Sequence, residues 1–321
     1  MKRIEYLDTA KGVLMLLVIL FHISEIGLSY NVGNRMINFL NKLVILYSPF
    51  FLTTFFFITG YCSSFNINFK TFIIKNIKTL LFPSFIFGLI IACIYAIQEG
   101  FIHITMYFKA IVCCGGSYWF ITALFTSKII YYFFIKILKS NTKILIAIVF
   151  LMFIAIFNNE NKILKNYWEI NNAFAFLFFL HLGQYMKTKH IKDYVYKIIS
   201  LLYIITISLC CILQINVPIL CMQIEFTYYN VFTMLIFAIA GGCFILSLSK
   251  QINNKILSYI GNNSLIIFMT HIFIIQKLTF LYELHNAFYT PFIIYFITIA
   301  ITIFIAMAVN SKYLKWMKGK F

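Results

Sequence analysis

The sequence predicts an all-α protein that crosses a membrane several times, and its composition is the first reason. Of the 321 residues, 62% are hydrophobic and 11% are charged, and the mean hydropathy is +0.92. A soluble domain carries about 25% charged residues. The second reason is that the apolar residues form runs of roughly 20, the length of helix that spans a bilayer.

These runs indicate about ten transmembrane helices. We place them at 10–30, 43–65, 79–98, 118–137, 144–157, 172–186, 198–215, 229–248, 262–281 and 290–309. The fourth span could instead be drawn at 106–125, but a start at Tyr118 and Trp119 puts aromatic side chains at the interface, where they are favoured. The runs at 144–157 and 172–186 are short for a span.

The positive charges orient these helices. The net charge of +17 would suggest a nucleic-acid partner in a soluble chain. Here the lysines gather in short loops between apolar runs, as topology determinants do, and we expect no nucleic-acid partner. Eighteen lysine and arginine residues fall on one side and five on the other. Both termini are therefore predicted to be cytoplasmic.

The predicted organisation is one integral-membrane domain over residues 1–321 without a separate soluble domain. The longest outer loops, 99–117 and 158–171, are too short to fold alone. The eight cysteines form no C-x-x-C pair and stand beside no histidine at the spacing of metal ligands. We therefore expect no metal, and we interpret the cysteines as small apolar residues.

The first apolar run carries four ionisable residues. Asp8 precedes Lys11 by one helical turn, and Glu25 follows His22 by one turn. The spacing of Lys11 and His22 is about three turns, so both lie on one helix face, roughly 16 Å apart along the axis. Ionisable groups at bilayer depth are costly and usually face a protein interior or a water-filled cavity. We interpret this stripe as a functional site.

The chemistry of these residues points to proton transfer. His22 is the side chain best placed to exchange a proton near neutral pH, and a desolvated histidine is a suitable general base for a hydroxyl nucleophile. The spacing predicts that Glu25 holds the imidazole in one tautomer, as an acidic residue does in a catalytic triad. The alternatives are a structural histidine and, for Asp8 and Lys11, an interfacial pair whose lysine reaches water.

Five stretches, in this order, resemble the integral-membrane acyltransferase 3 family over nearly the whole chain. They are RIEYLDTAKG at 3–12 followed by His22, FFFITGY at 55–61, KNIKTLLFP at 75–83, GSYWFITALF at 116–125, and GNNSLIIFMTH at 261–271. The Lys-Gly pair at 11–12 is similar to the fucose 4-O-acetylase-like branch. Most of the family carries arginine where Lys11, Lys75 and Lys78 stand here. Lysine keeps the charge but loses the planar bidentate fork of arginine.

The resemblance implies an enzyme that moves an acyl group, commonly acetyl, from acetyl-CoA to a hydroxyl of a cell-surface glycan or lipid-linked sugar. In that reaction His22 is the expected general base, with Glu25 and Asp8 as catalytic partners, and Asp8 keeps Lys11 charged and aimed. The cations expected to receive the phosphates of coenzyme A are Arg3, Lys11, Lys75 and Lys78.

Two residues of the later motifs are assigned to substrate binding. Trp119 would line the substrate pocket, and an interfacial tryptophan without that role is the alternative. His271 would also bind substrate, and a packing or hydrogen-bonding partner is the alternative. Lys75 and Lys78 could be topology charges alone.

Two other functions fit the sequence. A transporter or flippase of a lipid-linked sugar would suit ten spans and an internal polar stripe, but the chain shows no paired half-repeats and no matching broken helices. A non-enzymatic membrane subunit of a glycan-assembly complex would tolerate the loss of His22.

Overall fold

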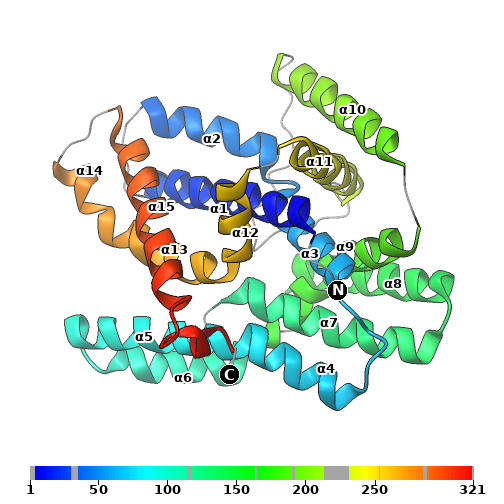
Figure 1. The fold of residues 1–321 in the computed structure, drawn as a ribbon, viewed down its shortest axis with the longest axis horizontal. Helices are drawn as coiled ribbons and strands as arrows, with labels where there is room; N and C mark the ends of the chain where they lie inside the picture. The colour runs from blue at the N-terminus through cyan, green and yellow to red at the C-terminus, as the bar shows by residue number, and fades with distance from the viewer. Residues whose placement is uncertain are drawn as a thin grey trace. The chain divides into compact units, whose positions relative to one another are not determined.

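The computed structural model describes residues 4–29, 35–114, 118–162, 165–189, 192–212, 231–252, 254–284 and 288–319. The regular elements in these ranges are all helices (Figure 1). The chain forms two compact units: a first unit of residues 1–55, 191–222 and 232–308, and a second unit of residues 56–190, 223–231 and 309–321. The prediction of one domain over 1–321 stays a prediction.

Most helices of the first unit are long. They are α1 (Glu5–Ser29), α2 (Arg35–Tyr47), α10 (Asp193–Ile212), α11 (Val231–Gln251), α12 (Lys255–Asn262), α13 (Ser264–Leu278), α14 (Phe280–Leu284) and α15 (Thr290–Val309). Helix α3 (Phe51–Cys62) runs from the first unit into the second.

The second unit holds the middle of the chain and its C-terminus. Its elements are α4 (Phe69–Asn76), the π-helix η1 (Ile77–Leu81), α5 (Phe82–Glu99), α6 (Ile102–Cys114), α7 (Trp119–Leu138), α8 (Asn141–Asn161), the 3₁₀ turn η2 (Tyr167–Glu169), α9 (Ile170–Thr188) and the 3₁₀ turn η3 (Lys315–Lys318).

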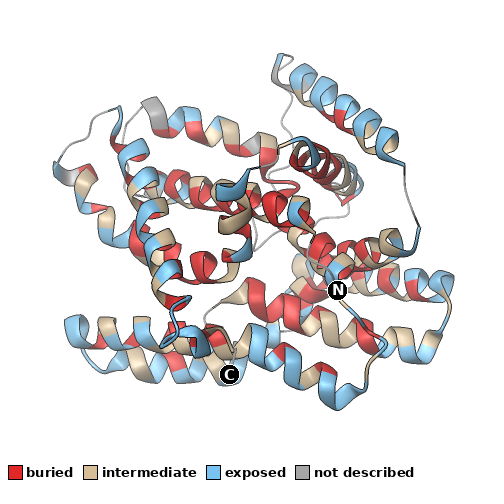
Figure 2. Cartoon of the chain, viewed as in Figure 1, coloured by how far each residue is buried: buried red, intermediate tan, exposed pale blue. Residues whose placement is uncertain are grey.

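Within the described ranges, seven helices are long and apolar enough to cross a membrane. They are Glu5–Leu28, Phe69–Glu99, Trp119–Leu138, Asn141–Asn161, Val231–Gln251, Ser264–Tyr282 and Thr290–Val309. Helices such as α10 and α15 expose large apolar side chains on their outer faces (Figure 2), among them Phe296, 64% exposed, and Phe304, 70% exposed. Apolar surface of this extent suits lipid rather than water. The chain is an integral membrane protein.

Several predicted spans differ from the helices that form. The run at 43–65 is broken, because α2 ends at Tyr47 and α3 covers only Phe51–Cys62. The short runs at 144–157 and 172–186 lie in longer helices, α8 and α9, which include polar flanks. The fourth span begins at Trp119, as the aromatic start predicted. The count of ten spans and the cytoplasmic termini stay predictions.

The lysines were expected in short loops between apolar runs, and for Lys75 and Lys78, just before Pro83, that expectation is wrong. Residues 69–99 form one continuous helical segment in which Lys75 belongs to α4 and Lys78 to η1. Proline lacks an N–H and clashes with the preceding turn of a helix. The wider π-turn directly before Pro83 relieves this conflict, since an inserted residue locally breaks the α-helical ladder.

The first unit is built on a close crossing of α1 and α12 (Figure 1). A Cβ atom added at Gly12 would lie 2.1 Å from the carbonyl oxygen of Leu257, and one added at Gly261 would lie 1.7 Å from the carbonyl oxygen of Asp8. Both backbones therefore touch without intervening side chains. Asn254 caps α12 by accepting hydrogen bonds from the backbone N–H groups of Ile256 and Leu257, at 2.8 and 3.1 Å.

Helix α10 is tied to its unit by Lys250 at the end of α11. The Lys250 ammonium donates to the Asp193 carboxylate at 2.5 Å and lies 5.2 Å from the Tyr6 ring centroid and 4.6 Å from that of Tyr196. This ammonium holds the pKa of Asp193 below its usual value. One cation thus joins the ends of α1, α10 and α11.

The second unit uses the same kind of crossing between α3 and α9. A Cβ atom at Gly60 would lie 2.0 Å from the carbonyl oxygen of Leu180, and one at Gly183 would lie 2.0 Å from that of Phe57.

Helix α7 is joined to α9 by polar contacts in an otherwise apolar core. Ser127 donates to the Ala173 carbonyl at 3.1 Å. The Tyr131 hydroxyl lies 2.9 Å from Nδ1 of His181.

The α1–α12 crossing makes a prediction about stability. Gly261→Ala is expected to destabilise the protein by roughly 1–3 kcal/mol, the usual cost of overpacking, because the new methyl group meets backbone that cannot move aside. Thermal unfolding in detergent measures the loss as a lower melting temperature. Gly242→Ala is the matched control, since the nearest atom to its Cβ would belong to a side chain and not to the backbone, the Thr54 hydroxyl oxygen at 3.0 Å. Equal melting temperatures for the two variants would contradict the crossing.

Candidate active site on the first helix

The four ionisable residues of the first apolar run lie on α1, and two of them form a hydrogen-bonded pair. Nδ1 of His22 is 2.9 Å from Oε2 of Glu25, one turn further along the helix. The His22 side chain is 15% exposed, whereas that of Glu25 is 60% exposed. A carboxylate only accepts hydrogen bonds, so in the neutral imidazole Nδ1 carries the proton and Nε2 keeps its lone pair. This is the tautomer that a general base needs.

The other two ionisable residues of α1 form an ion pair. Nζ of Lys11 lies 2.6 Å from Oδ1 of Asp8, and the exposed fractions of the two side chains are 26% and 8%. The pair lies beside the helix crossing, because the Asp8 carbonyl oxygen faces Gly261. A buried carboxylate without this cation would be costly. The pairing of Asp8 with Lys11 that the spacing predicted is therefore present.

A second histidine lies next to His22. His271, on α13, is fully buried, and its ring centroid is 5.1 Å from that of His22 with an interplanar angle of 47°. Helix α13 follows α12 after a single residue, Asn263, whose backbone N–H donates to the carbonyl oxygens of Tyr259 and Ile260 at 3.2 and 3.1 Å. The α1–α12 crossing therefore fixes the register of His271 against His22.

The basic residues of the second unit form a separate group. Lys75 and Lys78 are exposed, as a cation that receives a phosphate must be. Lys128, in the middle of α7, is half-buried and lies close enough to Lys75 for their charges to repel. Lys187 donates to the Ser63 carbonyl at 2.7 Å. Lys128 was not among the predicted site residues, although an ionisable residue within a span is a signal of function.

The other predicted site residues are Trp119, which belongs to the second unit, and Arg3. Trp119 is half-buried at the first turn of α7, with its ring centroid 5.9 Å from that of Phe120. Arg3 lies outside the described residues. Asp8, Lys11, His22, Glu25 and His271 thus belong to the first unit, and Lys75, Lys78 and Trp119 belong to the second.

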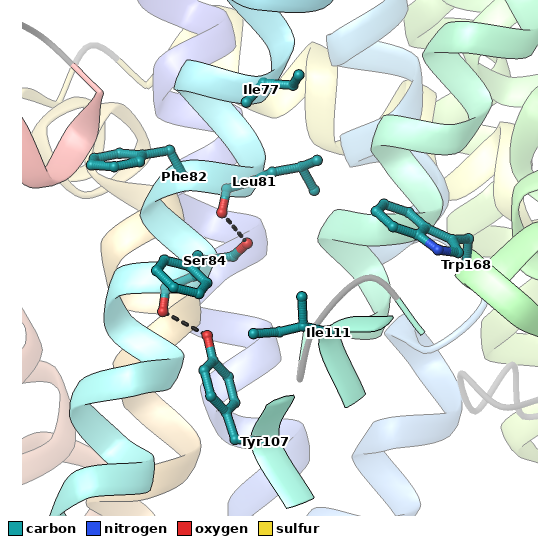
Figure 3. Close-up of a pocket in the computed structure, with 8 residues that line it drawn as sticks. Ile77, Leu81, Phe82, Ser84, Tyr107, Ile111 and Trp168 are labelled. Atoms are coloured by element: carbon teal, nitrogen blue, oxygen red, sulfur yellow. Dashed lines mark hydrogen bonds between the residues drawn. The ribbon is translucent and has the colours of Figure 1, made fainter. Parts of the chain in front are cut away.

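The second unit also contains an apolar pocket of about 260 Å³ (Figure 3). Its walls come from η1, α5, α6 and Trp168. The two polar side chains in the wall are already bonded to backbone, Ser84 to the Leu81 carbonyl at 2.8 Å and the Tyr107 hydroxyl to the Phe85 carbonyl at 2.6 Å. The pocket therefore offers no base for proton transfer. Among the described residues, no group of three or more His, Cys, Asp or Glu side chains is placed to hold a metal ion.

Comparison with known proteins identifies a family but no individual relative. No curated protein and no solved structure matches the chain significantly. The family model described as "Acyltransferase domain" matches residues 4–311, nearly the whole chain. The matched range contains α1 with His22 and Glu25, the lysines of α4 and η1, and α13 with His271. The chain therefore belongs to this acyltransferase family and is a membrane-bound acyltransferase.

Proposed function

We propose that this protein moves an acyl group, and specifically acetyl, from acetyl-CoA to a hydroxyl of a cell-surface glycan or lipid-linked sugar, with His22 as the general base. The observation that carries the proposal is the hydrogen bond of 2.9 Å between Nδ1 of His22 and the Glu25 carboxylate. It leaves the lone pair of Nε2 for the substrate. The proposed location is the bacterial cytoplasmic membrane, with both termini in the cytoplasm.

The proposed reaction uses each member of this pair. Nε2 of His22 takes the proton from the sugar hydroxyl as its oxygen attacks the thioester carbonyl. The carbon–sulfur bond then breaks, and the thiolate of coenzyme A takes the proton from the imidazolium. Glu25 stabilises that imidazolium while the proton resides on it. Its 60% exposure weakens this interaction relative to a buried triad, since water screens the carboxylate.

The proposed role of the lysines is to bind the phosphates of coenzyme A. Lys75 and Lys78 present exposed cations on consecutive turns of one helical segment, and Lys128 adds positive charge near Lys75. Lys11 is proposed for the same role on α1, about three turns from His22, a distance that an extended pantetheine arm reaches. Asp8 holds the Lys11 ammonium in place. Arg3 belongs to the same proposal from its place in the first motif.

Replacement of the base tests the proposal. His22→Ala is expected to lower acetyl transfer by at least about a hundredfold, the usual contribution of general base catalysis, without loss of the inserted protein. The measurement is transfer from labelled acetyl-CoA to the glycan fraction by isolated membranes. His103→Ala is the matched control, because His103 also pairs with a glutamate, Glu99, at 3.0 Å, but on α6. Near-normal transfer by His22→Ala would refute the assignment, and unchanged acetylation with altered glycan export would favour a transporter.

The partner of the base gives a second prediction. Glu25→Gln is expected to lower kcat by roughly tenfold to a hundredfold, because a neutral amide stabilises the imidazolium less than a carboxylate does. Steady-state kinetics with membranes at matched protein levels measures the change. A kcat equal to that of the wild-type protein would assign Glu25 to the interface alone.

The donor site gives a third prediction. The double variant Lys75→Gln, Lys78→Gln is expected to raise the KM for acetyl-CoA by roughly tenfold, since each lost phosphate contact is worth about 1 kcal/mol or less when exposed. Its KM should also depend less on salt than that of the wild-type protein. Lys143→Gln, an exposed lysine at the start of α8, is the control and should leave both values unchanged. Unaltered KM and salt dependence in the double variant would make these lysines topology charges.

A further inference from the structure

The tautomer of His271 is fixed by its own helix. Its Nδ1 atom lies 2.7 Å from the carbonyl oxygen of Phe268 and 3.1 Å from that of Ile267. Carbonyl oxygens only accept hydrogen bonds, so Nδ1 must carry the proton and donate it. The other ring nitrogen, Nε2, is consequently a bare acceptor with a lone pair.

That acceptor has no partner within the described part of the chain. Nε2 of His271 is buried and makes no hydrogen bond there, and the whole residue has an exposed fraction of 0%. A buried polar atom without a partner is rare in native proteins, because it has lost its hydrogen bonds to water. The two backbone hydrogen bonds at Nδ1 explain how the ring is held in place. They do not explain why Nε2 is buried without a partner among the described residues.

The position of this acceptor relates it to the base. The rings of His22 and His271 have centroids 5.1 Å apart. His22 presents a lone pair at Nε2 for the reason given above, and so does His271, so the two imidazoles offer two acceptors and no proton to share. A substrate group with a hydrogen-bond donor would satisfy the buried acceptor. His22 is 15% exposed, so a molecule that reaches His22 arrives beside His271.

We propose that His271 is a substrate-binding residue whose Nε2 accepts a hydrogen bond from an O–H or N–H group of the substrate held against His22. This inference rests on the proposed function and adds the binding chemistry of its site. The donor group is either a second hydroxyl, next to the one that His22 deprotonates, or an amide N–H of the pantetheine arm. His271 takes no proton in this role, because its Nδ1 atom donates to two backbone carbonyl oxygens and not to a carboxylate that would stabilise an imidazolium, as Glu25 does for His22.

Two amide replacements separate binding from packing. His271→Asn places an amide donor near the position of Nδ1 and removes the acceptor at Nε2. Asparagine makes this backbone contact elsewhere in the chain, since the Nδ2 atoms of Asn76, Asn161 and Asn263 donate to the carbonyl four residues earlier at 2.8, 2.8 and 2.9 Å. His271→Gln instead carries an amide oxygen towards the position of Nε2.

The experiment measures acetyl transfer by isolated membranes, with labelled acetyl-CoA and the cell-envelope glycan fraction each varied in turn. His271→Asn is expected to lower kcat/KM by about tenfold, the value of one hydrogen bond of roughly 1.4 kcal/mol, with an unchanged melting temperature. His271→Gln is expected to recover a substantial part of the loss. A raised KM for the glycan fraction identifies the acceptor hydroxyl as the bound group, and a raised KM for acetyl-CoA identifies the pantetheine amide.

Other outcomes overturn the inference. If His271→Asn transfers acetyl as the wild-type protein does, Nε2 binds nothing. If both variants lose activity in proportion to their melting temperatures, or lose kcat with both KM values unchanged, the ring serves packing. In all these cases, acetyl transfer by the wild-type protein would still support the proposed function. Absence of acetyl transfer by the wild-type protein would instead refute the proposed function and this inference with it.

Discussion

The direct backbone contact between α1 and α12 is the constraint on which the candidate site depends. Gly12 and Gly261 allow two helices to cross at a distance where any side chain would collide with a carbonyl oxygen. Since α13 follows α12 after one residue, the same contact sets how far His271 lies from His22. A pair of rings 5.1 Å apart cannot tolerate a slide of either helix by one turn, about 5.4 Å.

The polar groups of α1 illustrate how an apolar helix carries charge. Each ionisable side chain in the described part of α1 from Asp8 onward has a partner on the same helix, Asp8 with Lys11 and His22 with Glu25. Partners one turn apart limit the cost of placing charge near the bilayer. Nε2 of His271 differs, since it stays without a partner in the described residues. The substrate donor that we propose for His271 would supply the missing bond.

Two contacts of the candidate site followed from spacing. The i,i+3 intervals at 8–11 and 22–25 place each pair on one helix face, and both pairs are close in the structure. The proximity of His271 to His22 needed tertiary structure. Gly60 and Gly261, which stand in two of the motifs, are sites of close helix packing. The fold was less predictable at helix ends. Hydropathy does not locate the break at 48–50 or the π-turn at 77–81, because these depend on turn geometry and on Pro83. The electrostatic proximity of Lys128 to Lys75 needed tertiary structure.

The most direct test of the account is acetyl transfer by the purified protein in proteoliposomes, with labelled acetyl-CoA and the cell-envelope glycan fraction as the only substrates. The account predicts one acetyl ester formed for each free thiol of coenzyme A released, and both products abolished by His22→Ala. Two results would contradict the proposed reaction. One is movement of glycan across the bilayer without release of coenzyme A, and the other is release of coenzyme A that does not depend on His22.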